Sequence, residues 1–160
     1  MKKLIVLLLL VPIISFSQEK EYLSYDSVER PPIYPGCDVN IKNKLLRSCF
    51  VKKIQNHIAR NFRYPEFAQK TGIQGRVFVQ FIIDKDGSIM GIRTRGPHPI
   101  LEIEAKRIIS RLPKFIPALD LDGKAVKVPF SVPITFKLQK WINFGNGFGE
   151  YLQSYYLFGC

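Results

Sequence analysis

Residues 64–96, YPEFAQKTGIQGRVFVQFIIDKDGSIMGIRTRG, decide the fold because a helix signal is followed at once by a hairpin signal. A Pro at the start and a Gly at the end of a short run are typical of a helix, and we expect one from Pro65 to about Gly72. From Gly75 the apolar side chains alternate as they do in a strand. Asp86-Gly87 is typical of a tight turn, since Gly tolerates positive φ, and the return strand should run from about Ile89 to Arg95.

Helical patterns flank this hairpin on both sides. Upstream, apolar residues recur at helical spacing from Cys49 to Asn61, and Ser48 is available as an N-cap. Downstream, one apolar stripe runs from Pro99 to Leu112, where Pro113 should end the helix. The chain therefore mixes helices with antiparallel strands, which indicates an α+β domain.

The last strand has the clearest pattern in the chain, because the even-numbered residues from 126 to 138 are all apolar. One face of this strand must therefore be buried. Pro129 and Pro133 remove N–H donors from the same edge, so we place the strand at the border of its sheet. That outer edge can accept a strand from a partner. Between Lys127 and Lys137 it keeps usable backbone donors at Ser131, Thr135 and Lys137.

The first residues have the character of a secretory signal. Met1-Lys2-Lys3 is followed by an apolar run from Leu4 to Ile14, and Ser15 and Ser17 are small residues suited to cleavage, which we expect after Ser17. An uncleaved anchor in the inner membrane is the alternative. About 11 apolar residues, however, are fewer than the roughly 20 that span a bilayer. The 160 residues, of which 46% are hydrophobic, suit one exported, compact domain with extensions.

Export also sets the redox context of the cysteines. Cys37 and Cys49 are expected to form a disulfide. In the chain-entropy model, closing a loop of this size stabilises the folded state by about 3 kcal/mol. Cys160 is left over and could link two chains. A secreted enzyme that uses Cys160 or an unpaired Cys37 as its nucleophile is the alternative, but neither His57 nor His98 lies near a recognisable nucleophile motif. We therefore expect no catalytic residues, no cofactor and no metal site.

The chain is strongly basic, and removal of Lys2 and Lys3 with the signal lowers its formal net charge from +11 to +9. For an exported protein the polyanions within reach are envelope lipids and cell-wall polymers, and we expect no nucleic-acid partner. A structural envelope protein that binds such polymers or anionic lipid through a basic face is therefore one hypothesis. A set of solvated helix faces is the alternative. The basic residues gather at Lys42, Lys44, Arg47, Lys52 and Lys53, at Arg60 and Arg63, and at Lys106, Arg107, Arg111 and Lys114.

These observations divide the chain into four parts. We expect a signal peptide at residues 1–17, a tether with a Cys-containing turn at residues 18–48, and the α+β domain at residues 49–138. Residues 139–160 form a tail rich in Gly and aromatic residues, which either packs back on the domain or offers a sticky surface.

About half of the chain resembles the C-terminal domain of TonB, the periplasmic energy transducer for outer-membrane receptors. The resemblance lies in the order of the matching pieces. They are Tyr64-Pro65 with Ala68 and Gly72, Gly75-Arg76-Val77 leading into Phe81, Asp86-Gly87, Glu104-Ala105, and Val132-Pro133-Ile134-Thr135-Phe136. The segment Tyr34-Pro35-Gly36-Cys37, with Cys49, further resembles TonB-like proteins of the Bacteroidetes type.

The resemblance implies a three-stranded antiparallel sheet with two or three helices packed on one face. It also implies that the last strand accepts the short N-terminal TonB box of a receptor by strand addition. The expected partners are thus TonB-dependent outer-membrane receptors or related envelope proteins, and the expected role is energy-coupled transport across the outer membrane. We predict partner contacts from Tyr64, Pro65, Lys127, Ser131, Thr135 and Lys137.

Two departures from the family pattern qualify this expectation. In the family, Gln and Pro open a motif that ends in Tyr-Pro, whereas Asn61 and Phe62 occupy those two positions here. The family's transducer also has an inner-membrane helix and a long Pro-rich spacer. If the signal is cleaved, we expect this protein to need another protein that connects it to the inner membrane.

Overall fold

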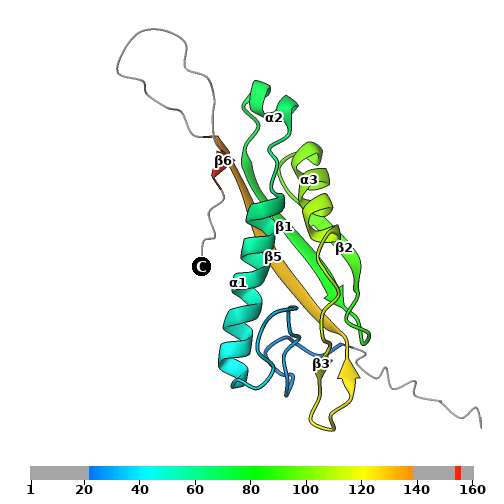
Figure 1. Ribbon diagram of the computed structural model, residues 1–160. Coiled ribbons are helices and arrows are strands. Elements are labelled where there is room, and N and C mark those ends of the chain that lie inside the picture. The colour runs from blue at the N-terminus through cyan, green and yellow to red at the C-terminus, as the bar shows by residue number, and fades with distance from the viewer. Residues whose placement is uncertain (1–21, 139–153, 156–160) are drawn as a thin grey trace, which may run out of the picture.

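The centre of the computed structural model, which describes residues 22–138 and 154–155, is an antiparallel sheet (Figure 1). Its strands lie in the order β2-β1-β5, and the short β6 pairs with the end of β5. The strands are β1 (Gly75–Ile83), β2 (Ile89–Arg95), β3 (Ala118–Leu119), β4 (Ala125–Val126), β5 (Val128–Leu138) and β6 (Ser154–Tyr155). The helices are α1 (Asn43–Asn61), α2 (Glu66–Thr71) and α3 (Pro99–Ser110). This arrangement confirms the predicted α+β fold with a three-stranded antiparallel sheet and helices.

The β1–β2 hairpin forms where the sequence predicts it. The turn needs Gly87, which has a φ of 82° and donates its N–H to the carbonyl of Asp84 at 2.8 Å. A Cβ atom there would lie 1.8 Å from the carbonyl oxygen of Phe115, so no other residue fits without moving the chain. Gly91, with a φ of 63°, lies where the β1–β2 register shifts, as a bulge requires.

The helices cover one face of the sheet. Figure 1 shows α1 and α3 side by side in front of the strands, with α2 at one end. Because side chains alternate along a strand, the odd-numbered residues of β1 and the even-numbered residues of β5 all point to this covered face. The core residues from the helices recur at helical spacing, as Phe50, Ile54 and Ile58 do on α1.

Two element boundaries differ from the sequence prediction. Helix α1 begins at Asn43, six residues before the predicted start at Cys49, and Ser48 lies inside the helix. The reason is Leu46, which is buried with Ile33 and Cys37 in a small cluster of its own. The final strand begins at Val128 rather than at residue 126, because Val126 belongs to β4 and pairs with Ala118 of β3. Helix α3 ends at Ser110, close to the predicted end.

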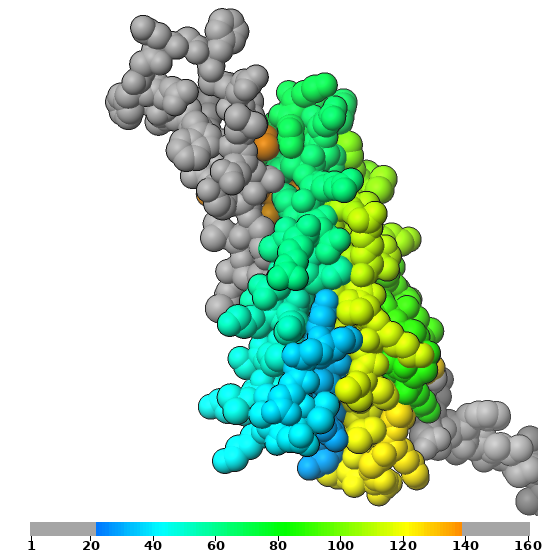
Figure 2. All heavy atoms as spheres, in the orientation of Figure 1, coloured from blue at the N-terminus to red at the C-terminus, as the bar shows by residue number. Residues whose placement is uncertain are grey.

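The segment expected to be a tether packs on the domain from Tyr22 onward. The N–H of Ile33 donates to the carbonyl of Ile116 at 3.0 Å, and that of Arg30 donates to Leu119 at 3.1 Å. In the space-filling view this segment (blue) lies between α1 (cyan) and the β3–β4 hairpin (yellow) (Figure 2). The residues that it contacts are distant in sequence, so no local sequence pattern predicts this packing.

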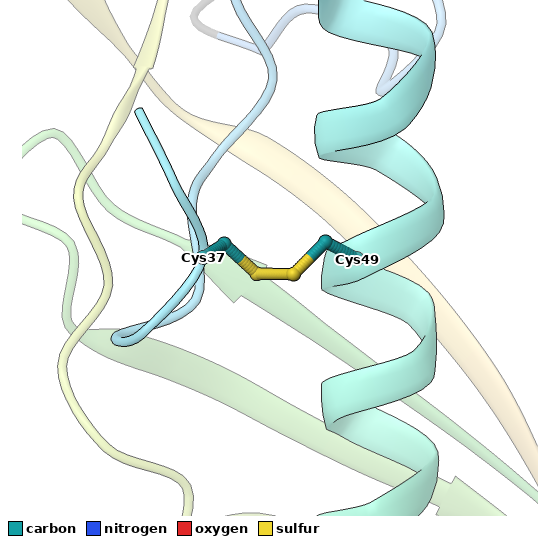
Figure 3. Close-up of a disulfide and its surroundings, with 2 residues drawn as sticks. All are labelled: Cys37 and Cys49. Carbon is teal, nitrogen blue, oxygen red and sulfur yellow. A yellow bond between two sulfur atoms is a disulfide. The ribbon is translucent and has the colours of Figure 1, made fainter. Parts of the chain in front are cut away.

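The predicted disulfide between Cys37 and Cys49 is present (Figure 3). It joins the N-terminal segment to the first half of α1, with 6.2 Å between the two Cα atoms. No helix in the described part of the chain is both long and apolar enough to cross a bilayer. The signal peptide expected at residues 1–17 and Cys160 lie outside the described residues, as does the tail apart from β6.

Candidate functional site

Strand β5 is bonded to β1 along one edge only. Every residue from Val128 to Phe136 lies opposite a residue of β1. Pro129 and Pro133 have no N–H, so their pairs with β1 must be the non-hydrogen-bonded ones of the ladder. The even-numbered residues of β5 therefore exchange hydrogen bonds with β1, while the N–H and C=O groups of the odd-numbered residues point outward.

Two hydrogen bonds at the ends of β5 agree with this alternation. The N–H of Leu138, an even-numbered residue, donates inward to the side chain of Gln74 at 2.8 Å. The carbonyl of Lys127, an odd-numbered residue, accepts from the N–H of Leu23 at 3.0 Å on the outer side. The geometric basis of the sequence prediction, an outer edge formed by odd-numbered residues, thus holds in the structure.

The outer edge is occupied at both ends and open between them. At one end Tyr22 bridges to Lys127, and at the other Tyr155 of β6 pairs with Lys137. From Pro129 to Thr135 the outer side of β5 pairs with no strand within residues 22–138 and 154–155. We call residues 129–135 the open edge. It presents the N–H groups of Ser131 and Thr135 and the carbonyls of all its odd-numbered residues.

Polar and basic side chains lie beside the open edge, together with the rings of Pro129 and Pro133. Ser131 is exposed, and Lys137 is exposed at one end. At the other end the ammonium of Lys127 lies 5.9 Å from the centre of the Tyr22 ring, a cation–π contact. The hydroxyl of Thr135 is buried and has no hydrogen-bond partner among the described residues. A buried hydroxyl without a partner costs about 1–3 kcal/mol, so an approaching polar group would be favoured there.

The side chain of Tyr64 lies in the core, whereas Pro65, the residue before α2, is half-buried. The side chain of Tyr64 is 6% exposed, and its hydroxyl donates to the carbonyl of Ile73 at 2.7 Å. Its ring stands edge-on to that of Phe136 in β5, with 5.7 Å between the ring centres. Burial raises the pKa of the Tyr64 phenol. Tyr64 can therefore position the end of β5 from within the core, but its side chain presents no surface to a partner.

Comparison with known proteins assigns part of this chain to a family. The family model described as the Gram-negative bacterial TonB protein C-terminal matches residues 60–138, which include the hairpin, α3 and the whole open edge. Residues 60–138 form a TonB C-terminal domain.

Relatives of this TonB C-terminal domain include the TonB proteins of two Helicobacter pylori strains. Protein TonB of strain J99 is 33% identical over 93 residues, which cover 57% of this chain and 31% of that protein. Protein TonB of strain 26695 is 48% identical over 44 residues, which cover 28% of this chain and 15% of that protein. The chain thus spans less than a third of the length of these relatives.

Solved structures of the Helicobacter pylori TonB C-terminal domain are also similar to this chain. A solution structure of the longer fragment is 30% identical, covers 64% of this chain and 88% of that one, and has a TM-score of 0.47. A solution structure of a shorter fragment is 32% identical, covers 55% and 92%, and has a TM-score of 0.42.

A buried ion pair in the TonB C-terminal domain holds the segment before Tyr64, and sequence reasoning missed it. Glu104 of α3, 8% exposed, accepts the backbone N–H of Arg63 at 3.0 Å and a 2.6 Å hydrogen bond from Arg107. Arg107 in turn donates to the carbonyl of Asn61 at 2.5 Å. The hydrogen bond to Glu104 raises the pKa of Arg107. No local pattern predicts this contact, because Arg63 and Glu104 are 41 residues apart in the chain.

Both histidines have structural roles in the described part of the chain. The Nε2 of His57 lies 3.0 Å from the carbonyl of Ile108, and His98 accepts the N–H of Ile100 as the N-cap of α3. Cys37, one cysteine of the enzyme hypothesis, is held in the disulfide. No group of His, Cys, Asp or Glu among the described residues could hold a metal ion. The backbone of the open edge is therefore the feature with the clearest means of binding a partner.

Proposed function

We propose that the open edge binds an extended peptide segment of an outer-membrane receptor, or of a related envelope protein, as an added strand. The protein would serve energy-coupled transport across the outer membrane from the periplasm, after export by the signal at residues 1–17. Its role in this proposal is binding and coupling rather than catalysis. Membership of residues 60–138 in the TonB C-terminal family supports this assignment.

The observation that carries the proposal is the set of outward backbone groups between the occupied ends of β5. Seven residues at about 3.3 Å each make the open edge roughly 23 Å long, enough for a short peptide strand. Main-chain hydrogen bonds would supply the affinity, as in other cases of strand addition. Ser131 and Thr135 would donate to the peptide, Lys127 and Lys137 would flank it, and Tyr64 with Pro65 would position the strand from behind.

The proposal is tested by an NMR titration of residues 18–160 with peptides from the N-terminal regions of TonB-dependent receptors. Saturable shifts centred on residues 127–137 are expected. Thr135→Pro removes an outward donor without touching the ladder to β1, so it should weaken binding about 2- to 12-fold, the equivalent of one hydrogen bond. Thr135→Val is the matched control, because it keeps the N–H and removes only the hydroxyl. Equal binding by wild type and Thr135→Pro would refute strand addition.

A dimer linked through Cys160 stays a separate prediction. Non-reducing gel electrophoresis of the exported protein, with Cys160→Ser as control, would test it. Strand addition does not require such a dimer, because each chain has its own open edge.

A further inference from the structure

The charged side chains that β1, β2 and β5 place on the sheet face opposite the helices are all basic. Residues that lie opposite each other in an antiparallel pair share a face, so Arg95 lies beside Phe78 and Arg93 beside Gln80. By the same rule Arg76 lies beside Thr135. We call this surface the arginine face, defined by Arg76, Phe78, Gln80, Arg93 and Arg95. Strands β1, β2 and β5 contain no Asp or Glu, so no strand residue offsets its charge.

The arginines of this face have no partners within the described chain. Arg76, Arg93 and Arg95 are exposed, and none makes an ion pair or side-chain hydrogen bond among residues 22–138. Each guanidinium therefore keeps its planar fork of donors for an external acceptor. Apolar surface lies beside them: Phe78, opposite Arg95, is 50% exposed, and Met90, beyond the bulge, is 40% exposed.

The arginine face is hollowed rather than flat. One hollow of about 420 Å³ runs from Arg93 and Gln80 past Ser131 to Tyr22. A second, of about 530 Å³, runs from the same three residues along Phe78 and Arg95. The two hollows thus meet at the centre of the sheet, where side chains of a bound segment could enter.

We propose that the arginine face binds an acidic, extended peptide segment of a protein partner through side chains of β1 and β2, beside the open edge. Arginine forks fit carboxylates with two parallel hydrogen bonds, which favours Asp and Glu side chains as ligands. Arg93 and Arg95 are two residues apart on one strand, about 6.8 Å, and carboxylates at alternate positions of an extended peptide have the same spacing. Phe78 lies opposite Arg95 and provides an apolar contact beside it.

The shape of the face favours a peptide over a membrane surface. A layer of lipid headgroups is flat on this scale, whereas the hollows accept individual side chains. The proposal also stands independently of strand addition, because it uses side chains of β1 and β2 and no backbone group of the open edge. Charge-assisted binding at exposed positions should weaken with added salt, since screening acts on such pairs.

The test measures binding of a fluorescent peptide with Asp at alternate positions to the exported chain by anisotropy. The matched peptide has Asn in place of Asp. Arg93→Gln with Arg95→Gln removes two charges from the face, and Lys44→Gln with Lys52→Gln removes two exposed charges from α1 on the other side of the sheet. All four side chains are exposed, so both variants should fold, which circular dichroism checks.

We expect the acidic peptide to bind wild type and the α1 variant equally, and the Arg93/Arg95 variant at least tenfold more weakly. Thr135→Pro should leave this binding unchanged, which separates it from the open edge. Equal losses in both charge variants would mean non-specific attraction and overturn the proposal. So would equal binding of the Asn peptide, or binding of phosphatidylglycerol vesicles through Arg93 and Arg95 without any binding of the acidic peptide.

Discussion

Glu104→Gln should destabilise the domain strongly although it preserves the shape of the side chain. Glu104 accepts hydrogen bonds from Arg107 at 2.6 Å and from the backbone of Arg63 at 3.0 Å in a mostly buried position. The substitution leaves the Arg107 charge without its counter-charge, and Arg107 is only 27% exposed. Breaking a fully buried pair costs about 3–5 kcal/mol, so for this partly buried pair we expect about 2–3 kcal/mol.

Urea unfolding followed by circular dichroism, with the disulfide intact, measures this loss. At a slope of about 1–3 kcal/mol per molar urea, a loss of this size should lower the urea midpoint by roughly 0.7–3 M. Glu66→Gln is the matched control, because the Glu66 carboxylate is 88% exposed and pairs with Lys70 at 3.9 Å. Such an exposed pair contributes about 0.3–0.5 kcal/mol.

A second substitution separates lost charge pairing from lost packing. One nitrogen of Arg107 is already buried without a partner among the described residues. Adding Arg107→Met to Glu104→Gln removes the unpaired charge and should recover part of the lost stability. If Glu104→Gln costs no more than Glu66→Gln, or if Arg107→Met adds to its loss, the ion pair does not stabilise the segment before Tyr64.

Three further predictions concern the turn, the disulfide and a buried phenol. Gly87→Ala should lower the free energy of unfolding by about 3 kcal/mol or more, because the added Cβ would overlap the carbonyl of Phe115. Gly123→Ala is the control, since Gly123 has a φ of 75° but open space around it, and it should cost about 1–2 kcal/mol. Urea unfolding midpoints of the two variants test the difference. Replacing Cys37 and Cys49 by Ser should cost about 2–4 kcal/mol, and reductant should then have no further effect on the thermal midpoint. Burial raises the pKa of Tyr25 to about 12. In the unfolded chain the phenol ionises near pH 10. The free energy of unfolding should therefore hold its value below about pH 10 and fall as the pH rises toward 12. Urea unfolding at several pH values should show a smaller fall for Tyr25→Phe than for wild type.

Local patterns were sufficient for the hairpin, α2 and the border position of β5. The Asp-Gly turn and the two prolines on one edge of β5 affect only the backbone within a few residues of themselves. Their structural effects can therefore be predicted from the local sequence. The start of α1 depends instead on Leu46 meeting Ile33, and the packing of residues 22–33 depends on residues 116–127. Contacts of that range leave no periodic trace in a single sequence.

The candidate site likewise has features that the sequence predicts and features that it does not. The alternation of donors along Ser131 and Thr135 follows from backbone geometry and was predictable. The burial of Tyr64 was not, because its hydroxyl partner Ile73 and ring partner Phe136 come from separate parts of the fold. The arginine face also escaped prediction, since the register between β1 and β2 includes a bulge that decides which side Arg93 and Arg95 take.

The attachment of the N-terminal segment has a mechanical consequence. Tension applied ahead of Tyr22 would meet the bridges at Lys127, Leu119 and Ile116 one after another, and it would also have to expose the buried side chains of Val28 and Ile33. Detachment of the segment would then reach Cys37, and from there the disulfide to Cys49 would transmit the force to α1. The disulfide thus limits how much of the N-terminal segment tension can extend, because the chain before Cys37 stays covalently joined to α1.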